Sequence, residues 1–101
     1  MKQVALVTGG SRGIGLGIAR ELAASGFDLA INGVRPEGDV TPILESIRSM
    51  GADVIYCQGN VALAADRKKI LQQIRHYFNR LHILVNNAGI GYFGLFLDTP
   101  T

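Results

Sequence analysis

The sequence has few of the residue types that build cross-links and metal sites. Its 101 residues include one cysteine, Cys57, and no tryptophan. A single cysteine excludes an internal disulfide and a cysteine-based metal cluster. Cys57 lies in an apolar run without the sequence pattern of an activated thiol, so we predict a structural role for it and no metal site in the chain.

The excess of positive over negative charge is also small, and the sequence has no long apolar run. Charged residues make up 18% of the chain, and the formal net charge is only +2. The Lys and Arg residues are scattered, which excludes the positive stripe that nucleic-acid binding needs. No apolar stretch reaches the roughly 18 residues of a membrane span. We therefore expect a soluble, cytoplasmic, globular protein with no nucleic-acid partner and no membrane partner.

What is present is a regular alternation of short apolar runs and longer stretches with helical periodicity. The apolar runs 3–8, 28–32, 53–57 and 82–89 predict four strands, separated by three helices. Strands that are apolar on both sides must be parallel and covered by helices, which right-handed crossovers place on the sheet faces. The sequence thus predicts an α/β fold of the Rossmann type, a doubly wound parallel sheet with strand order 3-2-1-4 and the fourth strand as a bare edge.

The helix after the first strand is predicted from apolar residues at a spacing of four. Ile14, Ile18 and Leu22 recur at this spacing with Ala19 and Ala23 beside them, so we expect these residues on its buried face. Gly26 lies just past the end of the pattern, where a left-handed residue can stop a helix.

The other two helices are predicted from their end signals. Thr41 offers a capping hydroxyl and Pro42 suits the first helical position, so the second helix should begin near this pair and bury Ile43, Ile47 and Met50. The third helix should cover 64–78 with Arg67 directed largely outward. Asn79 can take the left-handed stop after it.

The stretch LVTGGSRGIGLGIA, residues 6–19, places a glycine-rich turn between the first strand and the first helix. Such a turn lies at the carboxyl end of a parallel sheet, where unpaired N–H groups and the helix dipole favour an anion by roughly 0.3–2 kcal/mol. Gly9, Gly13 and Gly15 allow positive φ angles and let a pyrophosphate approach without a Cβ in the way. The alternative is a turn whose glycines serve helix-to-strand packing alone.

The glycine spacing distinguishes between phosphate-binding turns. No glycine is followed by lysine, which excludes a Walker loop, and Ile18 stands where the G-x-G-x-x-G fingerprint needs its third glycine. The pattern is G-x-x-x-G-x-G. Together with LVNNAG at 84–89, the segment TGGSRGIG at 8–15 resembles the classical short-chain dehydrogenase/reductase family, and within it the bacterial 3-oxoacyl-[acyl-carrier-protein] reductase type of fatty acid biosynthesis.

The resemblance covers nearly the whole chain and implies a set of cofactor-binding residues. In the turn these are Thr8, Gly9, Ser11, Arg12, Gly13, Ile14 and Gly15. At the end of the fourth strand, Asn87, Ala88 and Gly89 would line the cofactor's ribose, although Asn86 and Asn87 could simply end that strand. Asn60 and Val61 stand where the family usually has Asp-Val beside the adenine. An asparagine oxygen can accept the same hydrogen bond.

The residues near the end of the second strand indicate which nicotinamide cofactor is bound. A site that prefers NAD has an acidic residue there, but the corresponding position is Gly33. Arg12 and Arg35 offer two guanidiniums for the 2′-phosphate of NADP. We therefore expect NADP(H), with NAD the less favoured cofactor. The alternative for Arg35 is a solvated loop residue.

The resemblance also implies catalytic groups that the 101 residues do not contain. The family's catalytic tyrosine has a lysine four residues later, and none of Tyr56, Tyr77 and Tyr92 does. We expect residues 1–101 to be the N-terminal dinucleotide-binding part of a longer, homo-oligomeric reductase of 3-oxoacyl thioester or related carbonyl substrates, inactive alone. The alternative is a non-catalytic nucleotide-binding or interaction module whose exposed strand edge pairs with another chain.

Overall fold

The computed structural model describes residues 2–87, so the expectations for 88–101, including those for Ala88 and Gly89, lie outside the described residues. In chain order the elements are β1 (Val4–Thr8), α1 (Gly13–Ala24), β2 (Asp28–Gly33), α2 (Glu37–Arg48), β3 (Val54–Gln58), α3 (Ala64–Phe78) and β4 (Ile83–Asn86). All strand pairs are parallel, and the order is β3-β2-β1-β4. The predicted Rossmann-type topology is confirmed.

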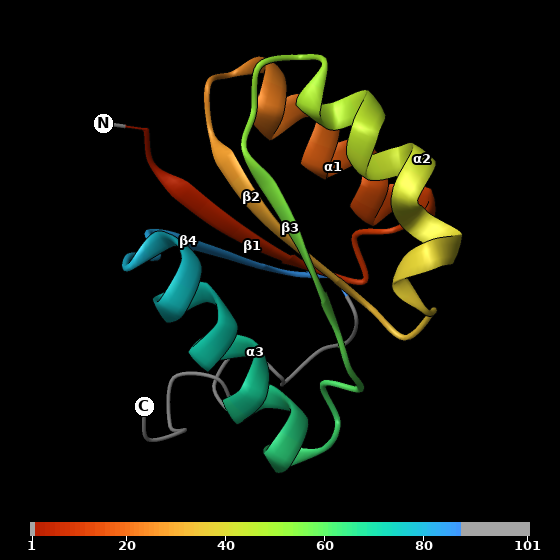
Figure 1. The fold of residues 1–101 in the computed structure, drawn as a ribbon, viewed down its shortest axis with the longest axis vertical. Coiled ribbons are helices and arrows are strands. Elements are labelled where there is room, and N and C mark those ends of the chain that lie inside the picture. Colours follow the sequence, from red (N-terminus) through yellow and green to blue (C-terminus); the bar gives the residue numbers. More distant parts are fainter. Residues whose placement is uncertain (1, 88–101) are drawn as a thin grey trace.

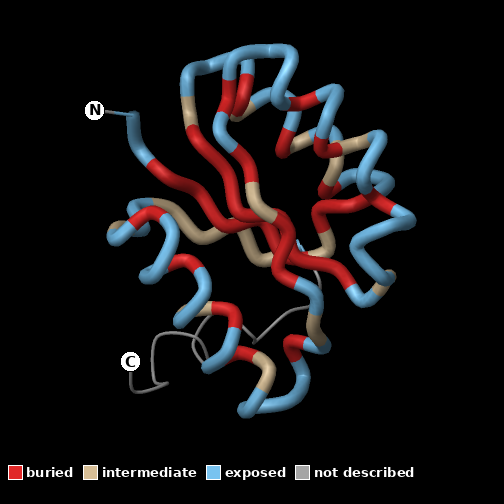
Figure 2. The backbone as a smooth tube through the Cα atoms, in the orientation of Figure 1, coloured by how far each residue is buried: buried red, intermediate tan, exposed pale blue. Residues whose placement is uncertain are grey.

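The sheet is the middle of three layers. Helices α1 and α2 cover one face and α3 covers the other (Figure 1). Buried residues run along the central strands (Figure 2), and alternate residues of each strand feed two separate cores. Val7 and Ile31 belong to the core under α1 and α2, whereas Leu6 packs with Ile70 and Ile74 of α3. Burying such a side chain contributes about 1.5–3 kcal/mol, which is why strands covered on both faces are apolar throughout.

Helix α1 packs against the sheet through its smallest residues. Its buried positions are Gly15, Ala19 and Ala23. Ala19 and Ala23 are buried as expected, but Ile14 is 79% exposed and Ile18 and Leu22 are only partly buried, so the expectation is wrong for the three large residues. The reason is the close approach that the glycine turn imposes: a Cβ on Gly15 would collide with the carbonyl oxygen of Gly9.

Helix α2 begins at Glu37 and not near Thr41 as predicted. The Thr41 hydroxyl donates to the Glu37 carbonyl at 3.1 Å inside the helix and caps nothing, and Pro42 lies within the helix. Glu37 and Asp39 occupy the first turn, where acidic side chains favour the positive end of the helix dipole. The buried face also differs from the prediction, because Met50 is 45% exposed and the buried residues are Val40, Leu44 and Ile47.

Helix α3 has the predicted bounds and the predicted stop, with Asn79 in the left-handed region at φ 60°. Arg67 differs from the prediction, because it is only 7% exposed and its Nη1 donates to the Val61 carbonyl at 2.8 Å. The loop before α3 folds over the first turn of the helix, so this guanidinium binds a loop carbonyl and does not reach solvent.

Strand β4 is the least covered strand. Among the described residues it pairs only with β1, and all four of its residues are partly exposed. Within residues 2–87, no helix has both the length and the apolar character needed to cross a bilayer.

Candidate nucleotide-binding site

A cavity of about 260 Å³ opens at the carboxyl ends of β1, β2 and β3. Ligands of open parallel sheets bind at this edge, where the loops diverge as the strand order reverses. The cavity is lined by Asn32, Gly33, Val34, Gly59 and six residues that the sequence predicted: Gly9, Ser11, Arg12, Arg35, Asn60 and Val61. The fold thus brings together residues separated by up to half the chain.

The glycine turn has the backbone geometry expected of an anion cradle. Gly9 and Gly13 adopt φ values of 62° and 61°. A Cβ on Gly15 would meet the Gly9 carbonyl oxygen and lie 2.6 Å from Asn87 Nδ2, so only glycine fits there. No side chain of the described residues caps α1, and its first turn holds no acidic residue. The N–H groups of this turn are therefore free of the competitors that usually occupy a helix N-terminus.

Arg35 reaches from the end of β2 to the glycine turn. Its Nη2 donates to the Ser11 carbonyl at 2.7 Å, and its own carbonyl accepts from the Tyr56 hydroxyl at 2.7 Å. Its Nε is buried and has no partner among the described residues. A buried donor without an acceptor costs about 1–3 kcal/mol, a cost that this position bears in the described part of the chain. Arg12, exposed at the N-cap of α1, adds a second cation.

Asn60 and Val61 form the far wall of the cavity. The Asn60 side-chain oxygen accepts from the Ala62 N–H at 3.0 Å, and the Asn60 N–H donates to Asp66 at 2.7 Å. The first bond forms an Asx turn, and the second ties this loop to the first turn of α3. An amide oxygen has two lone pairs, so Asn60 retains an acceptor for a ligand.

Thr8 and Asn87 hold the glycine turn from the β4 side. Thr8 is fully buried, and its hydroxyl accepts from the Asn87 N–H at 3.0 Å. Asn87 Nδ2 donates to the Gly9 carbonyl at 3.2 Å. The Ile14 side chain, by contrast, lies on the exposed face of α1 and does not line the cavity. The described contacts of Thr8 and Asn87 therefore position the turn.

Sequence reasoning missed Asn32, which joins β3 and the loop after it to the glycine turn. Only 2% exposed, its Nδ2 donates to the carbonyls of Cys57 and Gly59, both at 3.0 Å, and its Oδ1 lies 3.4 Å from the Gly9 nitrogen that donates to it. The available signal was a polar residue near the end of an otherwise apolar strand.

Burial governs the two titratable side chains of β3. Cys57 is fully buried, and this burial raises the pKa of its thiol to about 12. Burial also raises the pKa of the Tyr56 phenol, against a smaller lowering by the Arg35 charge. Both groups are protonated at neutral pH, so Cys57 is a structural strand residue, as predicted. Among residues 2–87, no group of three His, Cys, Asp or Glu side chains could hold a metal ion.

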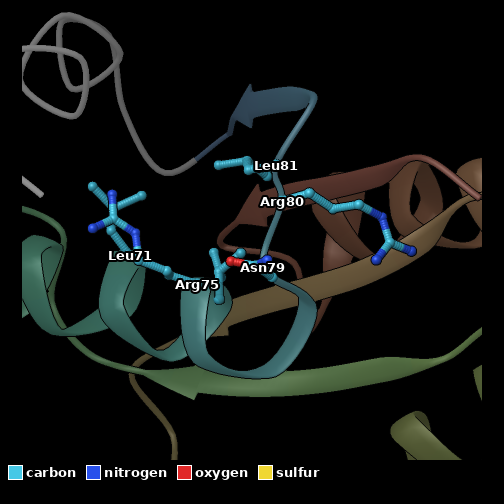
Figure 3. A pocket seen from close by; sticks show the side chains of 6 residues that line it. Leu71, Arg75, Asn79, Arg80 and Leu81 are labelled. Carbon is cyan, nitrogen blue, oxygen red and sulfur yellow. The ribbon is translucent and has the colours of Figure 1, made fainter.

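A second cavity, of about 280 Å³, lies at the opposite end of the sheet. Figure 3 shows its walls, with Leu71 and Arg75 on α3 and Leu81 on the segment that leads into β4. It adjoins the amino end of β4, where open parallel sheets do not place their ligands. We therefore take the cavity beside the glycine turn as the candidate nucleotide site.

The fold and this cavity define a class, that of Rossmann-type α/β proteins with a glycine turn at the first strand-to-helix connection. The chain belongs to the short chain dehydrogenase family, whose model matches residues 3–101. This family consists of oxidoreductases that bind nicotinamide cofactors.

Three known proteins illustrate the similarity. The chain is 41% identical over 90 residues to a 3-oxoacyl-[acyl-carrier-protein] reductase of Staphylococcus aureus (strain Mu50), a match that covers 89% of this chain and 37% of the relative. A short-chain dehydrogenase/reductase of Sinorhizobium meliloti 1021 superimposes with a TM-score of 0.84 at 46% identity, covering 88% of this chain and 41% of the other. A 3-oxoacyl-[acyl-carrier protein] reductase of Brucella melitensis in complex with NAD superimposes with a TM-score of 0.81 at 41% identity, covering 90% of this chain and 35% of the other.

Proposed function

We propose that residues 1–101 are the N-terminal, NADP(H)-binding part of an oxidoreductase that reduces a 3-oxoacyl thioester or a related carbonyl compound. The bound cofactor supplies hydride. Family membership and the similarity to 3-oxoacyl-[acyl-carrier-protein] reductases support the reaction class. The chain spans little more than a third of the length of these relatives, so the activity belongs to the longer protein. As the resemblance implies, that protein would be a cytoplasmic homo-oligomer.

The residues around the cavity fit the parts of a dinucleotide. The N–H groups of the glycine turn and the first turn of α1 would hold the diphosphate. Asn60 and Val61 would hold the adenine, and the segment 87–89 would lie along a ribose. Arg12 and Arg35 would take the 2′-phosphate by charge-assisted hydrogen bonds.

The preference for NADP(H) is supported by the presence of both Gly33 and Arg35 at the cavity. Gly33 presents no carboxylate to the ribose hydroxyls, whereas Arg35, a permanent cation, lines the same cavity. An NAD-preferring site needs the reverse arrangement, a carboxylate that accepts from the ribose and repels a phosphate.

The test is a titration of the full-length protein with NADPH and with NADH. We expect tighter binding of NADPH, and an Arg35→Ala variant should bind NADPH about 10- to 100-fold more weakly, with a much smaller change for NADH. Arg75→Ala, which removes an exposed guanidinium from α3, is the control and should change neither affinity. Equal affinities of the wild type for both cofactors contradict the proposed preference.

The 101 residues alone should not catalyse the reduction. They contain no Tyr-x-x-x-Lys pair, and each general acid or base of such a site contributes about 10²- to 10⁴-fold to the rate. Saturable NADPH oxidation by the purified 101-residue chain with an acetoacetyl thioester contradicts this expectation.

A second candidate function is a non-catalytic interaction module, favoured by the one-sided pairing of β4 among the described residues. A full-length protein that binds NADPH but oxidises it with no carbonyl substrate supports this alternative.

A further inference from the structure

The space beside Gly33 is already occupied. A Cβ on Gly33 would lie 2.8 Å from the Tyr56 hydroxyl and 2.8 Å from Ser11 Oγ, closer than real Cβ contacts. Both neighbours are buried, with Tyr56 6% exposed and Ser11 4% exposed. Any side chain at position 33 must therefore displace one of two enclosed groups, one on β3 and one in the glycine turn.

The strand register explains why Tyr56 reaches this position. Tyr56 pairs with Ile31, two residues before Gly33 on β2, and both belong to the core under α1 and α2. Residues two apart on a strand share a face, so the phenol extends along that face toward the end of β2. Its hydroxyl passes beside Gly33 and donates to the Arg35 carbonyl at 2.7 Å.

Arg35 is consequently held at both ends. Tyr56 fixes its backbone carbonyl, and the Ser11 carbonyl accepts from its Nη2 at 2.7 Å. A guanidinium has five N–H donors. The Ser11 carbonyl takes one of the Nη2 donors and the Nε donor is buried, so the donors left for a ligand are those of Nη1 and the second Nη2 hydrogen.

We propose that Tyr56 is the positioning residue that sets the choice of cofactor, an inference that rests on the NADP(H) function proposed above. Its hydroxyl lies 2.8 Å from the place that the Cβ of an acidic residue at position 33 would take, and so blocks the side chain that would reach the ribose hydroxyls of NAD. Its hydroxyl holds Arg35 where the guanidinium can meet the 2′-phosphate of NADP. One phenol thus excludes the group that favours NAD and orders the group that favours NADP.

The first experiment compares Tyr56→Phe with Tyr77→Phe in the full-length protein. Each variant loses one hydroxyl that donates a hydrogen bond, but Tyr77 donates to Asp53 at 2.9 Å, at the other end of the sheet. Tyr56→Phe should weaken NADPH binding about 3- to 10-fold and leave NADH binding within about 2-fold, while Tyr77→Phe should leave the ratio unchanged. The pair 2′,5′-ADP and AMP, which differ only in the 2′-phosphate, repeats the comparison without the nicotinamide half.

The second experiment places Gly33→Asp in two backgrounds. In the wild-type background the new Cβ meets both close contacts. In a Ser11→Ala, Tyr56→Phe background both contacting oxygens are gone, and the Ser11 Cβ lies at an ordinary 3.4 Å. The NADH-over-NADPH affinity ratio should rise at least about 10-fold in the triple variant compared with Gly33→Asp alone.

The outcomes separate this inference from the function on which it rests. A wild-type protein that binds neither cofactor, or prefers NADH, overturns the NADP(H) function. A wild type that prefers NADPH, with an unchanged ratio in Tyr56→Phe, overturns only the role of Tyr56. Equal weakening of both cofactors, or loss of the fold in Tyr56→Phe as seen by thermal unfolding, assigns the hydroxyl a structural role and also overturns it. A Gly33→Asp single variant that folds and prefers NADH also overturns the role of Tyr56.

Discussion

At the scale of single residues, Gly15 and Gly17 lie two positions apart in α1 and have opposite surroundings. A Cβ on Gly15 would meet the Gly9 carbonyl oxygen and Asn87 Nδ2, whereas a Cβ on Gly17 would meet nothing within 4 Å. The first glycine is needed for the close approach of helix and turn. The second only lowers the intrinsic stability of the helix.

We predict that Gly15→Ala lowers the free energy of unfolding by about 1–3 kcal/mol, because the turn must move away from α1. The same movement should weaken NADPH binding, since the turn N–H groups lose their alignment. Gly17→Ala is the matched control and should raise stability by about 0.5–1 kcal/mol with unchanged affinity. Urea denaturation and NADPH titration of the full-length protein measure both effects. Equal changes of stability and affinity in the two variants would contradict the close approach of Gly15 to the glycine turn.

Cys57 makes the free energy of unfolding depend on pH in the alkaline range. Its folded-state pKa of about 12 lies above the ordinary value of 9.0, chiefly through burial and secondarily through Glu37. The folded chain therefore holds this proton more tightly than the unfolded chain. The resulting stability is complete below pH 9.0 and is lost as the pH rises toward about 12, by up to about 4 kcal/mol.

The measurement is chemical denaturation at about pH 8 and about pH 11 for the wild type and Cys57→Ala. The variant should be less stable at the lower pH, because it loses buried volume, but should lose less stability between the two pH values. Tyr56 titrates in both proteins, and the Cys57 charge is the smallest of the causes that shift the Tyr56 pKa, so the Tyr56 contribution largely cancels from the comparison. An equal loss in both proteins contradicts the predicted contribution of the thiol.

Residues of the site could be predicted where the signal is local in sequence. The glycine turn is one continuous stretch, and the positive φ angles of Gly9 and Gly13 follow from it. Asn32 and Tyr56 could not be predicted, because their roles depend on which residues of neighbouring strands lie opposite them. That register exists only after the sheet has assembled.

At the scale of elements, Asn32 joins the ends of β2 and β3 to the glycine turn. Its amide nitrogen faces two carbonyl oxygens at 3.0 Å in a buried position, so a carboxylate there would face two acceptors without a donor. We predict that Asn32→Asp lowers the free energy of unfolding by about 3 kcal/mol or more.

The control for this prediction is Asn60→Asp, in the loop after β3. Asn60 is exposed, and an aspartate keeps the acceptor that binds the Ala62 N–H, so the unfolding free energy should change by no more than about 0.5 kcal/mol. Urea denaturation compares the two variants. A similarly small effect of Asn32→Asp contradicts the connecting role of its amide.

Strands and α3 could be predicted well because their signals do not compete. A short apolar run between turn residues indicates a strand, and α3 has both a long periodic pattern and a left-handed stop. Helix α1 was also predicted, but the exposure of Ile14, Ile18 and Leu22 could not be, because the glycine turn forces the small residues of α1 against the sheet. In α2, two acidic residues before the Thr41-Pro42 pair already suit a helix start, so the cap signal was misleading.

At the scale of the whole molecule, apolar surface remains open in the described residues. Ile14 is 79% exposed and borders a hollow of about 500 Å³ on the outer face of α1, together with Ile18 and Leu22. Strand β4 is half-buried along its length. Contiguous apolar surface and an unpaired strand edge both promote association between chains.

We predict that the 101-residue chain, purified alone, associates in a concentration-dependent way in size-exclusion chromatography. Ile14→Glu should shift the elution toward the monomer, because it places a charge on the apolar face of α1 at a position exposed enough to leave the fold unchanged. Gln72→Glu adds the same charge to the exposed side of α3 and should leave the elution unchanged. A monomeric wild-type chain at all concentrations contradicts association. If the wild type and Ile14→Glu associate equally, the contact is instead assigned to the edge of β4, where main-chain hydrogen bonds form regardless of the charge on α1.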